Sequence, residues 1–437
     1  MKRHALIGLC LYGAGVLHAQ PDCTVTHYSV EDGLSENTVS CMYQDSRGYL
    51  FIGTFNGLNR FDGYRFRHYK TLTTSGAGQE LEEDRIEEIR EDRDGLLWVR
   101  VWGGRVYRFD AWNERFTKVP LPGKTGVNGV LPFRNGDVWL TTGNEGCFRV
   151  ETGPADSAFR VETVRTPVLP SDTVYGVHED RRGDGWLLTG AGAVRYRSEN
   201  GGYACFRGDS SAFLTLAEGE NVLLLGTASG RVYRYEAQGE AFAPLPFRFR
   251  SPVVQIERLD STRFVILTEE EGFVLYDSRT GVRESHDRRN HPLLPAGKLR
   301  HVYVDRCGEL WLRPETPGIL HYDPRTGEMR HLYLPMDNAG AKRPAAEIFE
   351  DNNGFLWLRQ EGGGFCFYDR RKRRPVYFHN DPDDPRRLFT NIVRRYYSDR
   401  QGNLWLSTHS KGVEKVNFHS SAFRLTRFSP DPGALTE

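Results

Sequence analysis

The chain has little that would suit it to bind nucleic acid or to cross a membrane. Its 58 lysine and arginine residues are balanced by 58 aspartate and glutamate residues, so that its formal net charge is zero. A neutral balance argues against a nucleic-acid-binding protein and against a polybasic protein of the membrane surface. Apart from one stretch at the N-terminus, no segment is apolar over a length that could span a bilayer.

Motifs of the common catalytic and metal sites are also missing. The sequence has no Cys-x-x-Cys pair, no nucleophile elbow and no phosphate-cradling glycine loop, and its 13 histidines are scattered. Acidic residues are abundant, but no pair of them stands out as an acid and base for glycoside cleavage. We therefore expect no metal, no other cofactor and no enzyme activity.

The N-terminus differs from the rest of the chain. A positive start precedes the apolar stretch Ala5–Leu17, and Ala19 then precedes Gln20. This pattern is typical of a secretory signal peptide over residues 1–19, with an uncleaved N-terminal anchor as the alternative. Export implies an oxidising compartment, yet the remaining cysteines lie in different repeats or termini, so we expect small core residues rather than a disulfide framework. These cysteines are Cys23, Cys41, Cys147, Cys205, Cys307 and Cys366.

The sequence contains one motif that is repeated nine times. The repeat is indexed by an aromatic or aliphatic residue, with spacings of 38 to 48 residues between copies. These positions are Phe51, Trp98, Trp139, Trp186, Leu224, Val265, Trp311, Trp357 and Trp405. Seven copies have Gly three residues earlier, and six have Asp three residues before that. The copies around Leu224 and Val265 have lost all three residues.

One copy of the repeat has the pattern of four antiparallel strands. Asp-x-x-Gly between two alternating apolar runs predicts a tight hairpin, in which Gly adopts positive φ. A second turn that ends in Gly, a third strand and a fourth apolar segment complete the unit. Four strands in about 44 residues is the period of a β-propeller blade. The fold class is therefore an all-β propeller of nine repeats, whose Trp residues we expect to pack blade against blade.

Two segments carry a resemblance to a known family. HYSVEDGLSENTVSCMYQDSRGYLFIGTFNGLNRFDGY (27–64) and GNLWLSTHSKGVEKVNFHSSAFRLTRF (402–428) resemble repeats of the two-component regulator propeller family. Members are typically periplasmic sensors of hybrid two-component systems in gut bacteria. In them, two seven-bladed propellers precede an immunoglobulin-like domain, a membrane helix and a histidine kinase. The resemblance implies a periplasmic location, an oligosaccharide ligand, control of glycan-utilisation genes, and a homodimer as in sensor kinases.

The chain departs from the family plan because it stops after nine repeats. No second membrane helix, kinase or DNA-binding module follows within the sequence. We interpret it as a sensor ectodomain without its membrane and kinase parts. The alternatives are a free-standing secreted propeller that acts as a protein-interaction scaffold and, less favoured, a propeller enzyme that cleaves glycans.

The number of blades in the ring is left open by the sequence. Following the family, residues 23–336 form a first, seven-bladed propeller, and residues 337–437 begin a second, incomplete one. The alternative is a single closed ring of eight or nine blades, completed by an N-terminal strand, Thr24–Val30, that pairs with the last repeat.

Candidate binding residues are sought where the repeat is broken. Two residues after the index position, two copies have Gly, but three copies have arginine. The same offset in different blades means the same height and face, so the three arginines could bind an anionic oligosaccharide bidentately. Neighbouring turns add an aromatic ring, a carboxylate and an imidazole. The predicted ligand-binding residues are Arg100, Trp102, Arg313, Arg359, Glu361 and His409. The competing interpretation is that each arginine pairs with a nearby carboxylate such as Glu315 or Glu361.

A second set of polar residues precedes the first strand of four repeats by two positions. These residues could line the mouth of a central channel, or they could cap the turn that leads into the strand. They are Asn37, Asp84, Asp172 and Asn391.

Overall fold

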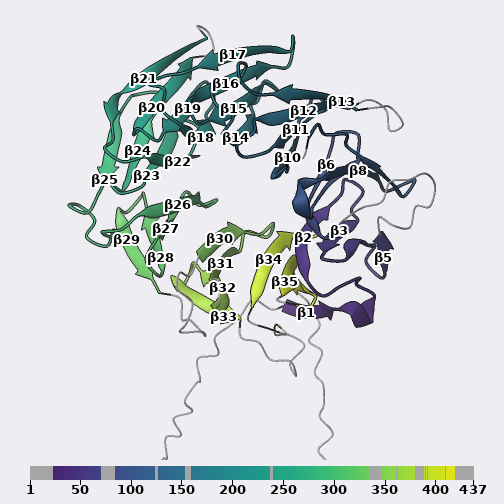
Figure 1. Ribbon diagram of the computed structural model, residues 1–437. Coiled ribbons are helices and arrows are strands. Elements are labelled where there is room, and N and C mark those ends of the chain that lie inside the picture. The colour runs from purple at the N-terminus through teal and green to yellow at the C-terminus, as the bar shows by residue number, and fades with distance from the viewer. Residues whose placement is uncertain are drawn as a thin grey trace, which may run out of the picture.

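Each copy of the repeat folds into one four-stranded antiparallel sheet. The computed structural model describes residues 23–69, 84–123, 126–152, 159–236, 240–333, 346–360, 363–378, 388, 390, 392–408 and 410–418. Within these ranges, nine four-stranded sheets stand as the blades of one ring. Figure 1 shows the blades following one another in chain order, from purple to yellow. The all-β propeller that the sequence predicts is confirmed.

The first four blades use four consecutive strands each. Blade 1 consists of β2 (Val39–Gln44), β3 (Leu50–Thr54), β4 (Gly57–Phe61) and β5 (Phe66–Tyr69). Blade 2 consists of β6 (Ile86–Glu91), β7 (Leu97–Val101), β8 (Val106–Asp110) and β9 (Arg115–Lys118). Blade 3 consists of β10 (Gly129–Pro132), β11 (Asp137–Thr141), β12 (Cys147–Glu151) and β13 (Arg160–Val164). Blade 4 consists of β14 (Val174–Glu179), β15 (Gly185–Thr189), β16 (Gly192–Arg197) and β17 (Gly202–Phe206).

The next four blades follow the same order. Blade 5 consists of β18 (Phe213–Glu218), β19 (Leu223–Thr227), β20 (Arg231–Glu236) and β21 (Ala241–Arg248). Blade 6 consists of β22 (Val253–Arg258), β23 (Arg263–Thr268), β24 (Phe273–Asp277) and β25 (Arg283–His286). Blade 7 consists of β26 (Leu299–Val304), β27 (Leu310–Pro314), β28 (Ile319–Asp323) and β29 (Glu328–Leu332). Blade 8 consists of β30 (Ala346–Glu350), β31 (Leu356–Gln360), β32 (Gly363–Asp369) and β33 (Arg374–Phe378).

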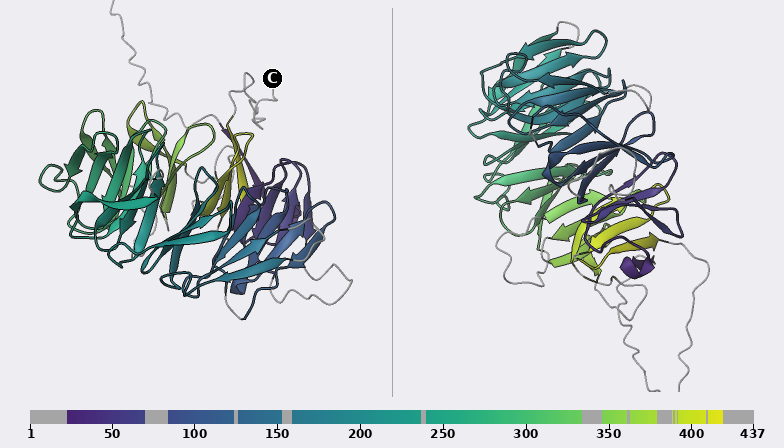
Figure 2. Two further views of the ribbon diagram at one scale, coloured as in Figure 1. Left: turned by 90° about the horizontal axis from the view of Figure 1, so that it is seen from above. Right: turned by 45° about the vertical axis from the view of Figure 1, so that its right-hand side comes forward.

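The ninth blade joins the two ends of the chain. Its sheet has the order β1-β36-β35-β34, so β1 (Cys23–Tyr28) is added to β34 (Val393–Ser398), β35 (Leu404–Thr408) and β36 (Val413–Phe418). β1 pairs antiparallel with β36, from Cys23 opposite Phe418 to Tyr28 opposite Val413. Figure 2 shows the purple and yellow strands side by side where the ring closes.

The structure therefore forms a single ring of nine blades, which was the alternative prediction. The preferred prediction, a closed seven-bladed ring followed by the start of a second propeller, is wrong. Blade 8 packs on blade 7 and blade 9 packs on blade 1: Trp311 shares a core cluster with Leu358, and Trp405 shares one with Ile52. No sequence rule gives the blade number, because the angle between blades depends on how their side chains fill the interface. The boundary expected between residues 336 and 337 and the signal peptide 1–19 lie outside the described residues.

The hydrophobic core lies between blades rather than inside each sheet. Trp139 of blade 3, for example, forms one buried cluster with Leu187 and Tyr196 of blade 4. Five of the six Trp index residues are completely buried, and the sixth, Trp405, is 2% exposed. The expectation that these residues pack blade against blade is confirmed.

The Asp of the repeat ties each hairpin to the Trp index residue. In five blades, one carboxylate oxygen accepts a hydrogen bond of 2.8–2.9 Å from the Trp indole N–H. The other oxygen accepts two backbone N–H groups of the turn, as Asp180 does from Arg182 and Asp184. The Gly of the turn has positive φ, as predicted, with 87° at Gly183. In blade 3, Phe133 replaces the Asp, and the indole nitrogen of Trp139 makes no hydrogen bond with any residue that the structure describes.

This difference between blades 3 and 4 gives a first testable prediction. Trp186→Phe removes an indole N–H from the buried carboxylate of Asp180, and we expect an added loss of about 1–3 kcal/mol of unfolding free energy. Trp139→Phe removes no hydrogen bond to a described residue, so we expect it to affect stability only through the change in packing. Denaturant unfolding of both variants measures the difference. Equal losses would contradict a stabilising role for the Asp–Trp bond.

The residue before that Asp links each blade to the one before it, a contact that the sequence analysis missed. In six blades the side chain at this position accepts a backbone N–H from the turn between the first two strands of the preceding blade, at 2.7–3.1 Å; in blade 5 the position precedes Gly219 instead of Asp. The acceptors are Gln44, Glu91, Glu179, Glu218, Glu350 and Ser398. Gln44 reaches Arg400 across the closure between blades 9 and 1. The signal was available as Glu-Asp at the start of the turns in three repeats.

Candidate functional site

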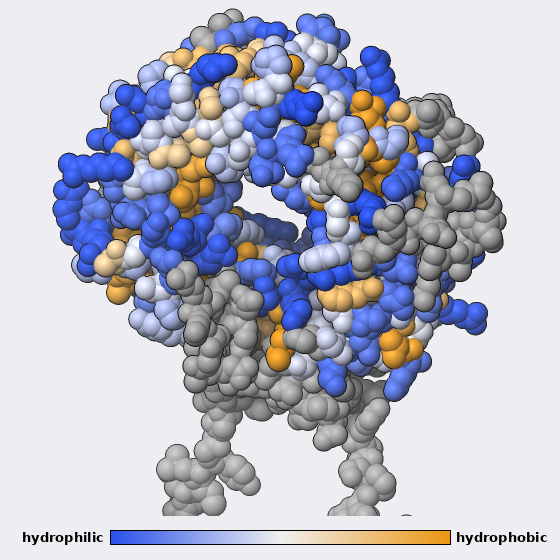
Figure 3. Space-filling model, viewed as in Figure 1, coloured by the Kyte–Doolittle hydropathy of each residue, from blue (hydrophilic) through white to orange (hydrophobic). Residues whose placement is uncertain are grey.

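The two faces of the ring carry different kinds of connection. The Asp-x-x-Gly turns lie on one face, which we call the turn face. The links between the second and third strands, and those from blade to blade, lie on the opposite face, which we call the loop face. The first strands of neighbouring blades, such as β2 and β6, lie against one another and surround the centre. Figure 3 shows an opening there with a mainly hydrophilic rim.

The three predicted arginines occupy equivalent strand positions but do not form one group. Each lies on the second strand of its blade, opposite a residue of the first strand: Arg100 opposite Glu88, Arg313 opposite His301, and Arg359 opposite Glu347. Blades 7 and 8 are neighbours, so Arg313 and Arg359 lie in adjacent sheets. Blade 2 is separated from blade 8 by blades 9 and 1, which sets Arg100 apart from the other two.

Two of these arginines are engaged with carboxylates of their own blade. Arg100 contacts Glu87 at 2.6 Å and Glu88 at 3.2 Å. Arg359 contacts Glu347 at 2.6 Å and donates to the carbonyl oxygen of Val393 in blade 9 at 2.8 Å. Arg359 is only 7% exposed. Pairing with a carboxylate, the competing interpretation, thus holds for both, although the partners are not the ones that the sequence suggested.

The neighbours of Arg313 and Glu315 differ from those of Arg100 and Arg359. Burial, and then the charge of Arg313, lower the pKa of His301 below its usual value. Glu315 contacts Arg300, which is not in the predicted set, at 3.0 Å. Glu361 and His409, which the sequence placed in the same site, lie outside the described residues.

The predicted channel-mouth residues form hydrogen bonds with backbone groups of the loops on the loop face. The Asn37 side chain accepts the backbone N–H of Val30 at 3.0 Å, and Asp172 accepts that of Thr166 at 2.7 Å. The carbonyl oxygens of Asn37, Asp84 and Asp172 accept the N–H of the turn glycine in the preceding blade. These contacts match the capping interpretation for Asn37 and Asp172. Asn391 lies outside the described residues.

Trp102 belongs to an aromatic cluster on the loop face that the sequence analysis identified only in part. The guanidinium carbon of Arg85 lies 4.0 Å from the ring centroid of Phe55 and 4.0 Å from that of Trp102. Trp102 remains 50% exposed and Phe55 39% exposed, so half of the larger ring can still contact a ligand. We call Phe55, Arg85 and Trp102 the aromatic clamp.

The clamp is held by the loops of two neighbouring blades. Phe55 lies in the turn between β3 and β4, and Trp102 begins the short 3-10 helix Trp102–Gly104 after β7. The N–H of Trp102 donates to the carbonyl oxygen of Arg85 at 2.8 Å. Gly104 has a φ of 76°, and a Cβ there would lie 2.4 Å from the backbone nitrogen of Val127, so only glycine fits. The sequence signal was an aromatic residue in the corresponding turn of both blades.

The clamp combines the two kinds of groups that sugar-binding and anion-binding sites use. An exposed indole ring offers a flat apolar surface for the face of a pyranose, and a guanidinium offers paired donors to hydroxyl or acidic groups. Within the described ranges, the carboxylate that Arg85 contacts is Glu87, at 3.6 Å, and Glu87 also contacts Arg100.

A recurrent bulge shapes the inner strands of the ring. In seven blades the register of the first and second strands shifts after the first paired residue, as between Val39 and Cys41. Bulges of this kind re-aim side chains and are frequent beside binding sites. In blade 2 the residue at the shift is Glu87, the carboxylate that Arg100 and Arg85 share. In blade 4 it is Tyr175, which is 54% exposed.

The described residues show no metal site and no membrane span. No cluster of three or more His, Cys, Asp or Glu side chains is arranged to hold a metal ion in this part of the chain. Among the same residues, no helix has the length and apolarity that a bilayer crossing requires. The six cysteines 23, 41, 147, 205, 307 and 366 are all free thiols, of which Cys23, Cys147 and Cys366 are buried.

Comparison with known proteins agrees with the resemblance of the first repeat. The family model described as two component regulator propeller matches residues 33–56. The fold is similar to the extracellular domains of the putative hybrid two component systems BT3049 and BT4673 from B. thetaiotaomicron. Sequence identities are 20% and 18%, with 93% and 90% of this chain and 55% and 58% of those chains covered, at TM-scores of 0.38 and 0.39.

Other propellers are similar at the same level. Virginiamycin B lyase from Staphylococcus aureus is 14% identical over 75% of this chain and 93% of its own, at a TM-score of 0.42. No curated protein sequence matches this chain. The chain spans little more than half the length of the two B. thetaiotaomicron domains.

Proposed function

We propose that this chain is the ligand-sensing ectodomain of a periplasmic two-component regulatory system, and that it binds an anionic oligosaccharide which controls glycan-utilisation genes. The aromatic clamp is the observation that supports an anionic oligosaccharide as the ligand, because in it the half-exposed Trp102 ring lies beside the guanidinium of Arg85. The match of residues 33–56 to the regulator propeller family supports the sensory role. The membrane and kinase parts would belong to a longer protein or to a partner.

The clamp would bind the sugar by stacking and by charge. The apolar face of a pyranose covers the exposed part of the Trp102 ring, and a carboxylate or sulfate of the sugar accepts hydrogen bonds from Arg85. Phe55 holds the other face of the guanidinium, so Arg85 is oriented before the ligand arrives. Such preorganisation lowers the entropy cost of binding.

Trp102→Ala should weaken glycan binding by about 2 kcal/mol, roughly 30-fold in Kd, because an aromatic anchor at the centre of a site is lost. Isothermal titration calorimetry with uronic-acid-containing and sulfated oligosaccharides measures the effect. Trp112→Ala is the matched control, because Trp112 is 83% exposed but lies between β8 and β9, on the turn face. Equal affinities of the two variants would exclude the clamp as the binding site.

The three predicted arginines could form a second part of the proposed binding site. If the ligand extends over the inner strands, Arg100, Arg313 and Arg359 would bind its acidic groups by exchanging their present partners. A triple alanine variant tests this with the same calorimetry, at a temperature where circular dichroism shows it folded. Unchanged affinity of the folded variant would remove these three arginines from the site and leave the clamp.

A protein-interaction scaffold is the second candidate, and exposed aromatic residues on the turn face favour it. Tyr64 and Trp112 lie in equivalent turns of neighbouring blades and are 93% and 83% exposed. Such exposed rings are typical of protein interfaces. A homodimer would be detected by sedimentation velocity and abolished by Tyr64→Ser with Trp112→Ser. We propose no catalytic role, and new reducing ends after incubation with glycans would contradict that.

A further inference from the structure

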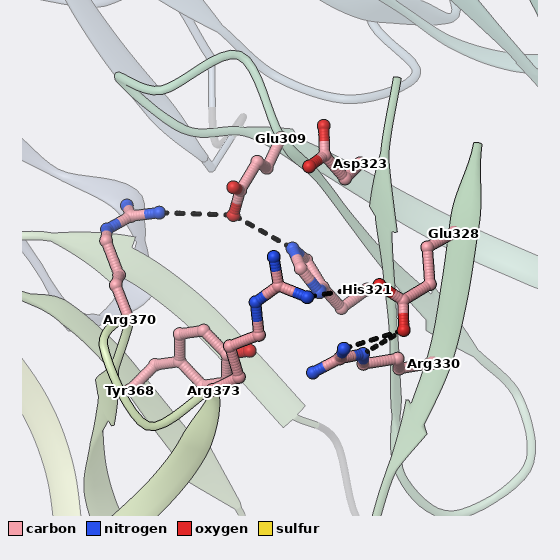
Figure 4. A pocket seen from close by; sticks show the side chains of 8 residues that line it. All are labelled: Glu309, His321, Asp323, Glu328, Arg330, Tyr368, Arg370 and Arg373. Atoms are coloured by element: carbon pink, nitrogen blue, oxygen red, sulfur yellow. Dashed lines mark hydrogen bonds and ion pairs between the residues drawn. The ribbon is translucent and has the colours of Figure 1, made fainter. Parts of the chain in front are cut away.

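A small polar cavity lies at the interface of blades 7 and 8, far along the ring from the aromatic clamp. Its volume is about 30 Å³. The lining residues come from β28, β29, the hairpin before β27, the end of β32 and the turn after β32; they are Glu309, His321, Asp323, Glu328, Arg330, Tyr368, Arg370 and Arg373. Figure 4 shows their side chains converging, with His321 and Arg370 meeting the same carboxylate of Glu309.

His321 occupies a position that is cationic in most blades. On the third strand, the residue opposite the index position is arginine in five blades and lysine in one, but it is His321 in blade 7. In blades 3 and 4, this arginine contacts the acidic residue two positions before the Trp: Arg149 with Asp137 at 3.1 Å and Arg195 with Asp184 at 2.6 Å. In blade 7, His321 Nε2 makes the same contact with Glu309 at 2.9 Å. A permanently charged pair is thus replaced by one that can gain or lose a proton.

The shorter imidazole leaves polar atoms unsatisfied inside the cavity. His321 is 7% exposed, and its Nδ1 makes no hydrogen bond with a described residue. Tyr368 of blade 8 is 4% exposed, and its hydroxyl lies near Arg330 but likewise makes no hydrogen bond of normal geometry within the described part of the chain. At the equivalent interface, Tyr235 of blade 5 bonds the guanidinium of Arg195. The cavity therefore lies where a longer arginine would have reached the tyrosine.

The charges around the cavity balance when His321 is neutral. Its lining holds three carboxylates and three guanidinium groups. Glu328 is shared by Arg330 and Arg373, at 2.6 and 3.2 Å. Glu309 is held by Arg370 and Arg325, and Asp323 by Arg325. Beyond the lining, Arg370 also contacts Asp305 and Glu350, and Arg306 lies 4.0 Å from Glu350. Each acid therefore already has a cationic partner, and a proton on His321 adds an unneutralised positive charge.

We propose that this cavity binds a small anion together with a proton on His321. The protonated ring donates from Nε2 to Glu309 and from Nδ1 to the anion, while the Tyr368 hydroxyl and the remaining N–H groups of Arg330 and Arg373 supply further donors. A volume of about 30 Å³ admits one small anion, or the acidic group of a larger molecule that reaches in from solvent. With His321 neutral, the lining has no excess positive charge, and water fills the same space.

Sulfate and chloride are the probes, titrated into the folded chain by calorimetry at constant ionic strength. Binding of either anion should be clearly weaker at pH 8 than at pH 5.5, because the cavity has no excess positive charge when the imidazole is neutral. His321→Asn should abolish the pH-dependent binding, and Tyr368→Phe, which keeps the ring packing, should weaken it severalfold. His331→Asn, on the neighbouring β29, is the matched control and should change nothing.

His321→Arg is the second variant, because it restores the residue type of the other blades and keeps the interface folded. It should bind neither probe, since the guanidinium fills the cavity and bonds Tyr368 directly. The proposal is overturned if the unmodified chain binds neither anion at pH 5.5, if binding is equal at both pH values, or if His321→Asn binds as the unmodified chain does. Its outcome is independent of the clamp, which Trp102→Ala tests separately.

Discussion

A chain without β1, residues 23–28, is expected to lose more than about 5 kcal/mol of unfolding free energy, because truncating one buried side chain alone costs about 2–5 kcal/mol. β1 supplies the outer strand of blade 9 and pairs with β36 along its whole length. Tyr28 stacks on Trp405 at 5.9 Å between ring centroids and packs on Phe61 of blade 1. Without β1, the last blade has an open edge and the ring loses this link between its first and last blades.

Denaturant unfolding followed by tryptophan fluorescence measures the loss. Thr24→Ala with Thr26→Ala is the control, since both side chains are exposed and such changes stay within about 0.5 kcal/mol. A synthetic peptide of residues 23–28, added in excess, should restore part of the stability by strand addition. If the shortened chain unfolds at the same denaturant concentration, ring closure through β1 is not what stabilises the fold.

Arg359→Ala is the second large effect that we expect, with a loss of about 2–4 kcal/mol of unfolding free energy. Breaking a buried ion pair costs about 3–5 kcal/mol, and the lower figure reflects that the Glu347 side chain remains 33% exposed to water. The variant also removes the donor to the Val393 carbonyl oxygen, which joins blade 8 to blade 9. Denaturant unfolding at neutral pH gives the free energy.

Arg313→Ala is the matched comparison for Arg359. Arg313 holds the same strand position in blade 7, but the residue opposite it is His301 rather than a carboxylate. Its removal takes away the cation opposite His301, and it relieves the positive charge that helps to lower the pKa of that imidazole. We expect a clearly smaller loss, and a His301 pKa closer to its ordinary value by NMR titration. An equal loss in both variants would show that the Arg359–Glu347 pair contributes little.

Most of the blade could be predicted because its pattern is local. Asp-x-x-Gly fixes a hairpin within a few residues, and the carboxylate of Asp180 confirms this by accepting two N–H groups of its own turn. The alternation of apolar residues then assigns each strand a face, and the periodic Trp marks the interface. These features depend on sequence neighbours only, so the strand pattern can be recognised in all nine copies, including the two that have lost Asp, Gly and Trp.

The candidate site could be predicted only in part because it joins different blades. Trp102 was identified as an aromatic residue beside charged groups, but its contact with Arg85 and Phe55 depends on two loops that meet on the loop face. The arginine set was correctly placed at one strand position. Pairing with carboxylates was foreseen as the competing interpretation, but the partners Glu87, Glu88 and Glu347 were not identified, because those acids lie across the sheet rather than nearby in sequence.

The sequence by itself determined the repeated unit: four strands, a capped turn and a buried aromatic residue, each set by interactions over a few positions. Only the tertiary structure decided that nine such units close into one ring, because closure requires β1 to meet β36 across nearly the whole chain. It also decided which irregular side chains become neighbours, bringing Arg85 between two rings and His321 beside Tyr368. Those choices depend on the packing angle between blades, which is the sum of many side-chain contacts and is encoded in no single motif.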